Sequence, residues 1–289
     1  MIFPLLLIAQ FEQTALDHNA DFKTRVMAIS KMSLSRDPGA LGPLKRLLLD
    51  EGESDEIRST AAAGIPSLDV SRQAQRQPLC AALRQKALPR QTRDAALVAV
   101  SNLGCDDSAD LERIAGQFGS RPAAGHRRAI GYAVQALGQS HFQQSSHALL
   151  RFLTYFDPGS DEKTVVLAAL LHKGKELMFL DPPTAADIRA TLLMESRYPA
   201  NATLALRLLA ATEDRGAASL ILRFLKNKDA EIATEAAETL AALRISRAKT
   251  KIKRLLAHIH EDSRFSPQPG RPDPAGLVER LGSALKQLQ

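Results

Sequence analysis

A segment that begins with arginine and continues into alanine-rich apolar positions recurs along the chain at nearly constant spacing. The segments RVMAISKM, RSTAAAGI, RDAALVAV and RRAIGYAV begin at separations of 33, 35 and 34 residues, at Arg25, Arg58, Arg93 and Arg127. Looser copies begin further along the chain, at Val165, Thr203 and Ile232. A period of this length is typical of proteins that stack one small structural unit many times.

A second amphipathic segment lies between consecutive copies and is clearest at residues 37–49, which read DPGALGPLKRLLL. Asp37 followed by Pro38 is a typical helix start, and Gly104, Gly138 and Gly174 fall where the helices of the arginine segments should end. The composition favours helices, because 45% of the residues are hydrophobic but only 4% are aromatic. We therefore predict an all-α fold in which each repeat is a pair of helices.

The arginine segment at residues 90–104, RQTRDAALVAVSNLG, is apolar around most of its circumference. Such a helix must be covered on several sides, by its own partner and by the neighbouring repeats. Small side chains are expected to let neighbouring helices approach closely, at Ala95, Ala96 and Ala99. Larger side chains are expected to fill the remaining volume, at Val98, Val100 and Leu103.

The repeats resemble HEAT-like repeats of the bacterial type, whose units read DP-x-A-L-x-P-L-x-x-L-L followed by R-x-x-A-x-x-A-L. The match is carried by the residues Asp37, Pro38, Ala40, Leu41, Pro43, Leu44, Leu47, Leu48, Arg58 and Ala61. It extends over about residues 20–262 and is weak across 155–200. The resemblance implies a right-handed α-solenoid, armadillo-like in kind, of about seven helix pairs. It also implies a protein-binding scaffold.

Four regions are predicted. Residues 1–20 form an apolar N-terminal segment, either a capping helix or an atypical export signal, and residues 21–262 form the HEAT-like solenoid. Residues 263–276 hold four prolines and are predicted to be a linker. Residues 277–289 form an amphipathic helix that either caps the solenoid or binds a partner.

Enzymatic chemistry is not indicated by the sequence, and we predict that the protein is not an enzyme. The HExxH, GxSxG, GxxxxGK[ST] and GxGxxG motifs are absent, and the single His-Glu pair, His260-Glu261, cannot build a two-metal site. No catalytic residue, metal ligand or cofactor is assigned. The acidic segment 50–56 is interpreted as a solvated loop, and Cys80 and Cys105 as two small buried hydrophobic residues.

Positive charge is concentrated at residues 244–254, which contain six Lys or Arg and no acid. On one continuous helix, a basic stripe would gather within an 80° arc beside an apolar packing face, at Arg244, Arg247, Lys251 and Arg254. The preferred interpretation of the stripe is a solvated outer face of the last repeat, and the alternative is a surface for an anionic partner.

The predicted function is a non-enzymatic scaffold or adaptor that binds a protein partner through the second helices of successive repeats, which line a concave face. One alternative is nucleic-acid binding through the basic helix 244–254, which the lack of tryptophan disfavours. Another is an accessory protein that presents a cofactor or substrate to an enzyme. The cytoplasm is favoured as the location, and export to the periplasm applies if residues 1–10 are a signal sequence.

Overall fold

The computed structural model describes residues 3–105, 108–116, 124–140, 143–174, 177, 182–195, 197–257, 259, 262–265 and 273–288. Across these residues the regular structure is helical and contains no strand. Sixteen α-helices are found there, in eight consecutive pairs, so the prediction of an all-α solenoid is confirmed. The number of pairs exceeds the expected seven or so because the first and last helices, outside the predicted repeat region, complete a pair at each end.

The chain divides into two compact units, residues 1–148 and 149–289. The first unit holds four pairs: α1 (Phe3–Leu16) with α2 (Phe22–Ser35), α3 (Leu41–Leu49) with α4 (Asp55–Gly64), α5 (Arg72–Leu83) with α6 (Arg90–Val100), and α7 (Ser108–Gly116) with α8 (Ala124–Gln139). Short 3-10 turns precede α3 and follow α4, at Pro38–Ala40 (η1) and Ile65–Ser67 (η2).

The second unit continues the same pairing. Its helices are α9 (Gln143–Tyr155, which begins before the boundary) with α10 (Asp161–Lys173), α11 (Pro182–Glu195) with α12 (Pro199–Ala211), α13 (Ala218–Phe224) with α14 (Ala230–Ala242), and α15 (Lys249–Ala257) with α16 (Pro274–Gln287). Three further 3-10 turns lie at Arg215–Ala217 (η4), Ser246–Ala248 (η5) and Ser263–Phe265 (η6).

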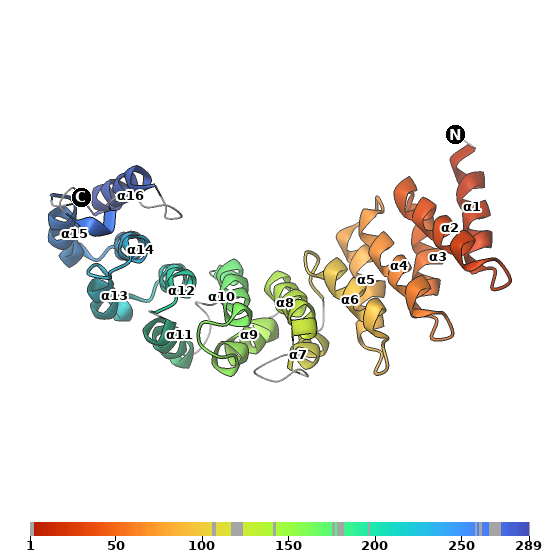
Figure 1. Ribbon diagram of the computed structural model, residues 1–289, viewed down its shortest axis with the longest axis horizontal. Coiled ribbons are helices and arrows are strands. Elements are labelled where there is room, and N and C mark those ends of the chain that lie inside the picture. Colours follow the sequence, from red (N-terminus) through yellow and green to blue (C-terminus); the bar gives the residue numbers. More distant parts are fainter. Residues whose placement is uncertain are drawn as a thin grey trace. The chain divides into compact units, whose positions relative to one another are not determined.

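The second helix of each of the first seven pairs carries the repeated arginine segment or its looser copy, and second helices pack on one another. In the first unit α2 packs on α4 and α4 on α6, and in the second unit α10, α12, α14 and α16 follow in the same way (Figure 1). The close approach is made by alanine: Ala61, Ala96 and Ala236 are fully buried. The predicted role of small residues in the inter-repeat core is thus seen directly for Ala96.

In the first two repeats, the repeated arginine has the same structural task. Arg25 donates from Nε to the carbonyl oxygen of Ala15 at 2.9 Å, and Arg58 donates in the same way to Leu48 at 3.1 Å. Each of these carbonyls lies in the last turn of the preceding helix, where carbonyl groups lack a partner within the helix. The outer nitrogen of each guanidinium then reaches the next repeat, at Glu53 and Gln85 respectively. In each case the arginine therefore ties its own helix to the preceding helix and to the loop between the two helices of the next repeat.

Asp55 makes another link between repeats. Its carboxylate accepts hydrogen bonds from the backbone N–H of Gln91 at 3.0 Å and of Thr92 at 2.8 Å, and from the Thr92 hydroxyl at 2.6 Å. The first turn of α6 is thereby capped from α4. Burial raises the pKa of Asp55, but these hydrogen bonds outweigh it, so the net pKa lies below its usual value.

The helix ends follow the sequence signals at most positions. Asp37 accepts from the N–H of Gly39 at 2.7 Å, and Pro38 opens the turn η1. Gly104 and Gly174 have positive φ angles of 73° and 49°, as expected for stops at these positions. Gly138 differs, because it lies within α8, one residue before that helix ends.

The terminal segments are helices that pack on their neighbours. Helix α1 lies against α2, and α16 lies against α14 and α15 (Figure 1). The buried face of α16 consists of Leu277, Leu281 and Ala284. In the predicted proline-rich linker, residues 266–272 lie outside the described residues, as do His258, His260 and Glu261. None of the described helices combines the length and hydropathy that crossing a membrane requires.

Candidate functional site

An apolar groove lies on the first unit, between the C-terminal end of α4, the turn η2, the start of α5 and one face of α6. We call it the α4–α6 groove. It has a volume of about 700 Å³ and its apolar lining consists of Ala63, Pro66, Ala95, Val98, Ala99 and Leu103. Three alanines leave the space, because a larger side chain at any of them would fill it.

Val98 and Leu103 were both expected to fill the core between repeats, but both line this groove. Leu103 is half-buried, and 46% of the surface of Val98 is exposed. Ala96 and Val100, on the other side of α6, are fully buried. The helix is apolar on more than its packing face, and the surplus apolar side chain lines the groove instead. The sequence carried no separate signal for the groove, because an apolar residue beyond the packing face looks the same in sequence as one within it.

Some polar side chains at the groove already make hydrogen bonds within the fold, and others do not. Gln75 donates to the carbonyl oxygens of Pro66 at 3.2 Å and Leu68 at 2.8 Å, so its amide supports η2. Asn102 accepts from Gln135 at 3.2 Å. Arg72 is exposed at the start of α5 and makes no ion pair within the described residues. The groove therefore combines an apolar floor with one available cation at its edge.

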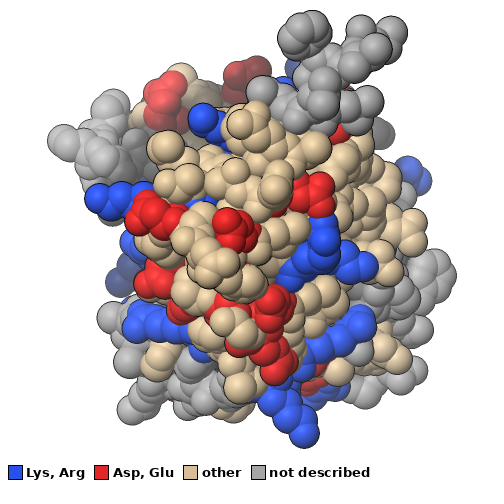
Figure 2. All heavy atoms as spheres, turned by 90° about the vertical axis from the view of Figure 1, so that its right-hand side faces the viewer, with Lys and Arg blue, Asp and Glu red and all other residues tan. Residues whose placement is uncertain are grey.

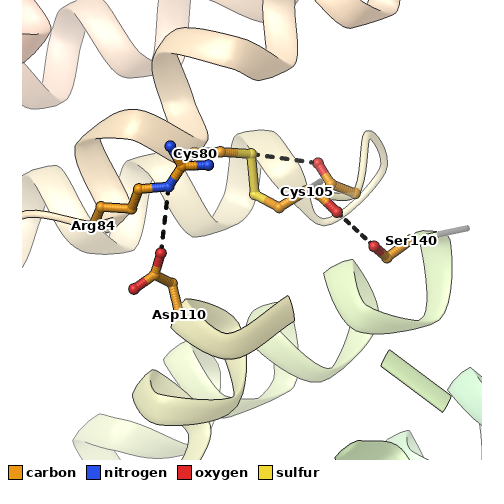
Figure 3. Close-up of a disulfide and its surroundings, with 6 residues drawn as sticks. Cys80, Arg84, Cys105, Asp110 and Ser140 are labelled. Atoms are coloured by element: carbon orange, nitrogen blue, oxygen red, sulfur yellow. Dashed lines mark hydrogen bonds and ion pairs between the residues drawn. A yellow bond between two sulfur atoms is a disulfide. The ribbon is translucent and has the colours of Figure 1, made fainter. Parts of the chain in front are cut away.

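A disulfide joins Cys80 on α5 to Cys105 in the turn after α6, with a Cα–Cα distance of 5.8 Å (Figure 3). Both cysteines are buried, as expected, but the prediction of two separate hydrophobic residues was wrong. The pairing arises because the turn after α6 brings the chain back beside α5, which a separation of 25 residues does not reveal. The Cys105 carbonyl also accepts from the Ser140 hydroxyl at 2.5 Å.

Acidic side chains gather at the N-terminal end of the first unit, where Figure 2 shows Asp and Glu in the middle of the face with Lys and Arg beside them. His18, Asp50 and Glu53 bring their ligand atoms within 4.8 Å of one another there. Glu53 is buried and forms an ion pair with Arg25. A guanidinium already neutralises the central carboxylate, so this cluster joins repeats rather than forming an open metal site.

The predicted basic stripe does not lie on one continuous helix. Arg244 follows α14 in a left-handed turn with φ 55°, Arg247 lies in η5, and Lys251 and Arg254 lie on α15. All four side chains are exposed. Arg247 donates to the Ser219 hydroxyl at 3.1 Å, a contact with the preceding pair. The packing face beside them is present, because Ala248 and Ile252 are fully buried.

Acidic side chains in the same part of the second unit are paired within the fold. Glu235 on α14 accepts from Arg207 at 2.8 Å and from Arg280 at 3.0 Å, and Glu238 pairs with Arg280. The hydrogen bond to Glu235 raises the pKa of Arg207 above its ordinary value, against the effect of burial. These ion pairs connect α12, α14 and α16, so they join consecutive second helices.

A deeper ion pair links Lys163 on α10 to Glu195 at the end of α11, with 3.2 Å between Nζ and Oε1. Both side chains are buried, and Asn201 donates to the second carboxylate oxygen at 2.8 Å. A buried charge requires such partners, since removing one leaves the other uncompensated. The two charges pair with each other and Asn201 completes the network, so we assign it to the fold.

Comparison with known proteins yields similarity of fold alone. No protein-family model and no curated protein matches the sequence. The YibA protein of Escherichia coli is similar in structure, with 13% identity and a TM-score of 0.56 over 97% of this chain and 91% of YibA. An engineered protein is similar over 98% of this chain and 81% of its own, with 16% identity and a TM-score of 0.55. The fold is thus a helical repeat solenoid.

Human deoxyhypusine hydroxylase in complex with glycerol also matches, with 15% identity and a TM-score of 0.37 over 99% of this chain and 98% of that one. Folds of one class host unrelated functions, so a helical-repeat fold does not by itself exclude catalysis. The prediction that this protein is not an enzyme is therefore wrong as an exclusion, because missing motifs test only familiar kinds of site.

Proposed function

We propose that the chain is a HEAT-like repeat scaffold and that it binds a segment of a partner protein in the α4–α6 groove. The observation that carries the proposal is the groove itself, where Val98 exposes nearly half of its surface beside three alanines. Apolar side chains exposed in a hollow of a soluble repeat protein are typical of a binding surface. Repeat proteins bind through such surfaces on stacked second helices.

The residues at the groove also define the chemistry of the partner. A volume of about 700 Å³ with an apolar lining accommodates aliphatic or aromatic side chains of a short segment. Arg72 at the edge is available to pair with a carboxylate, because it makes no ion pair within the described residues. We therefore expect the bound segment to carry an apolar anchor with Asp or Glu close to it in sequence.

The experiment compares what the wild type and Val98→Asp capture from the native host, with quantitative mass spectrometry as the readout. The acid introduces a charge into the apolar lining, and an anchor contact of this kind is worth about 2 kcal/mol or more, so the groove partner should be lost. Leu34→Asp is the matched control, because Leu34 is an exposed apolar residue on α2, outside the groove.

For the proposal to hold, capture of the partner must depend on the residues of the groove. Proteins retained by Leu34→Asp and lost by Val98→Asp are then tested with Arg72→Glu, which should weaken them as well, because the edge cation is reversed. If the wild type and Val98→Asp capture the same proteins in the same amounts, the groove is not the binding site.

We also propose that the chain works in an oxidising compartment, outside the cytoplasm that the sequence favoured. The Cys80–Cys105 disulfide supports this location, because cytosolic thiols are kept reduced while disulfides persist in exported proteins. The test is the mass of the protein isolated from its native host after alkylation without reductant. Two alkylated cysteines would contradict the proposal, and an unalkylated pair would support it.

A further inference from the structure

The positive charge of the chain comes from one stretch of it. Residues 215–257 contain ten Lys or Arg and four Asp or Glu, a net charge of +6 that equals the formal charge of the whole chain. All ten cationic side chains are exposed. The four acids lie on α14 or at its N-cap, whereas the cations lie on α13, α15 and the turns next to them. Positive charge is therefore separated onto the first helices of the last two pairs.

These cations form two rows, which we call the basic rows. Arg247, Lys251 and Arg254 follow one another at intervals of four and three residues along η5 and α15, so they share one face. Arg223 follows Ser219 by four residues on α13, so these two share a face, and Lys226 lies in the turn directly after this helix. Because Arg247 donates to the Ser219 hydroxyl at 3.1 Å, the two rows lie side by side at this end.

A second contact joins the turn η6, which follows α15, to the end of α13. Arg264, in the turn after α15, donates to the carbonyl oxygen of Leu225 at the end of α13 at 3.3 Å. Asp262 pairs with this arginine at 2.5 Å, and the hydrogen bond from Arg264 lowers the pKa of Asp262. Both contacts thus tie the last pair to α13, and the acid nearest to the second contact is already paired.

The acids on α14 are also largely engaged elsewhere. Asp229 caps α14 by accepting from the N–H of Glu231 at 2.8 Å, and Glu235 and Glu238 are paired with arginines of α12 and α16. Three of the four acids in residues 215–257 therefore have partners inside the fold. The cations of the basic rows are left to interact with something outside the described fold.

We propose that the basic rows dock the protein on an anionic lipid surface, where exposed Lys and Arg bind headgroup phosphates. The apolar residues beneath the rows, Ile221, Phe224 and Ile252, are buried, so the surface attracts phosphate without inserting into the bilayer. Nucleic acid fits less well, because the single aromatic residue of this stretch, Phe224, is too buried to stack on bases. The choice of lipid over nucleic acid also rests on the proposed oxidising compartment.

The test measures binding of the purified full-length chain to vesicles of phosphatidylcholine, with and without phosphatidylglycerol, by co-sedimentation. We expect binding to the phosphatidylglycerol vesicles alone, at ~150 mM salt, and weakening as salt rises. The triple variant Arg223→Gln, Lys251→Gln, Arg254→Gln should bind about 100-fold more weakly, since each Lys or Arg near an anionic surface contributes about fivefold. None of the three makes a hydrogen bond within the described residues that the change would remove.

The matched control removes the same charge from the first unit, with Lys23→Gln, Lys45→Gln and Lys86→Gln, all exposed residues. It should keep the wild-type affinity, and both variants should keep the wild-type circular dichroism and Tm. The proposal is overturned if the wild type does not bind anionic vesicles, or if the control loses as much affinity as the triple variant. It is also overturned if the wild type binds duplex DNA more tightly than the vesicles at the same salt concentration.

Discussion

Reduction of the Cys80–Cys105 disulfide should destabilise the first unit by a predictable amount. The bond closes a loop of 25 residues that contains all of α6, the helix at the centre of this unit. For a loop of that length, the loss of chain entropy in the unfolded state corresponds to about 3.5 kcal/mol at room temperature. In a unit of this size, the corresponding fall in Tm is about 7–14 °C.

The assay is thermal and urea unfolding of the oxidised protein, with and without a phosphine reductant, followed by circular dichroism. A double variant, Cys80→Ala with Cys105→Ala, is the control, and its Tm should not respond to the reductant. If the oxidised wild type and the reduced wild type unfold at the same Tm, the disulfide does not form or does not constrain the unfolded chain, and the reasoning fails. In that event the case for an oxidising compartment fails too.

Three further perturbations test the links between repeats. In the folded state the pKa of Asp55 is lowered from 3.8. Its carboxylate therefore contributes fully to the free energy of unfolding above pH 3.8, and this contribution is lost as the pH falls through the folded pKa. Asp55→Ala should lower the free energy of unfolding by about 1 kcal/mol at pH 7 and make stability less dependent on pH in the acid range. Ala96→Arg places an unpaired charge at a fully buried site and should cost about 3–5 kcal/mol; an unchanged Tm would show that Ala96 is not packed between repeats. Arg58→Met leaves the buried Leu48 carbonyl without its donor and should cost about 1–3 kcal/mol by urea unfolding, whereas a neutral result would remove the arginine from the links between repeats.

The repeats were predictable from the sequence because their cause is periodic. Each unit must bury the same kind of helix face, so alanine returns about every 34 residues. In the first two repeats, the returning arginine satisfies the same kind of carbonyl at the end of a helix. The pairing of Cys80 with Cys105 was not predictable, because it depends on where a single turn leads the chain. The exposure of Val98 was equally hidden, since an apolar residue beyond the packing face looks the same in sequence as one within it.

The basic rows show why one charged segment of the sequence reveals only part of a charged surface. The sequence marked residues 244–254 as one helix, but the chain turns at Arg244 and the helix begins at Lys249. The turn takes Arg244 out of the helical stripe. The preceding pair adds another cation beside that stripe, because Arg223 on α13 belongs to the neighbouring row. A solenoid places residues one repeat apart next to each other, so a surface on it has to be sought at the repeat period as well as at the helical one.

The two helices of a pair have different roles, and this difference explains where exposed charge can accumulate. Second helices pack on second helices on both sides, and Glu235, between Arg207 and Arg280, shows that their charged residues are used in holding that stack. The first helix α13 is joined to the last pair through the turns η5 and η6, which contact Ser219 and Leu225 respectively. The exposed faces of α13 and α15 therefore have no comparable role in holding the repeats together. Substitutions to Lys or Arg cost little at such exposed positions. A binding surface can therefore develop on the first helices without disturbing the core. The α4–α6 groove differs, because it is lined by second helices that also pack on each other.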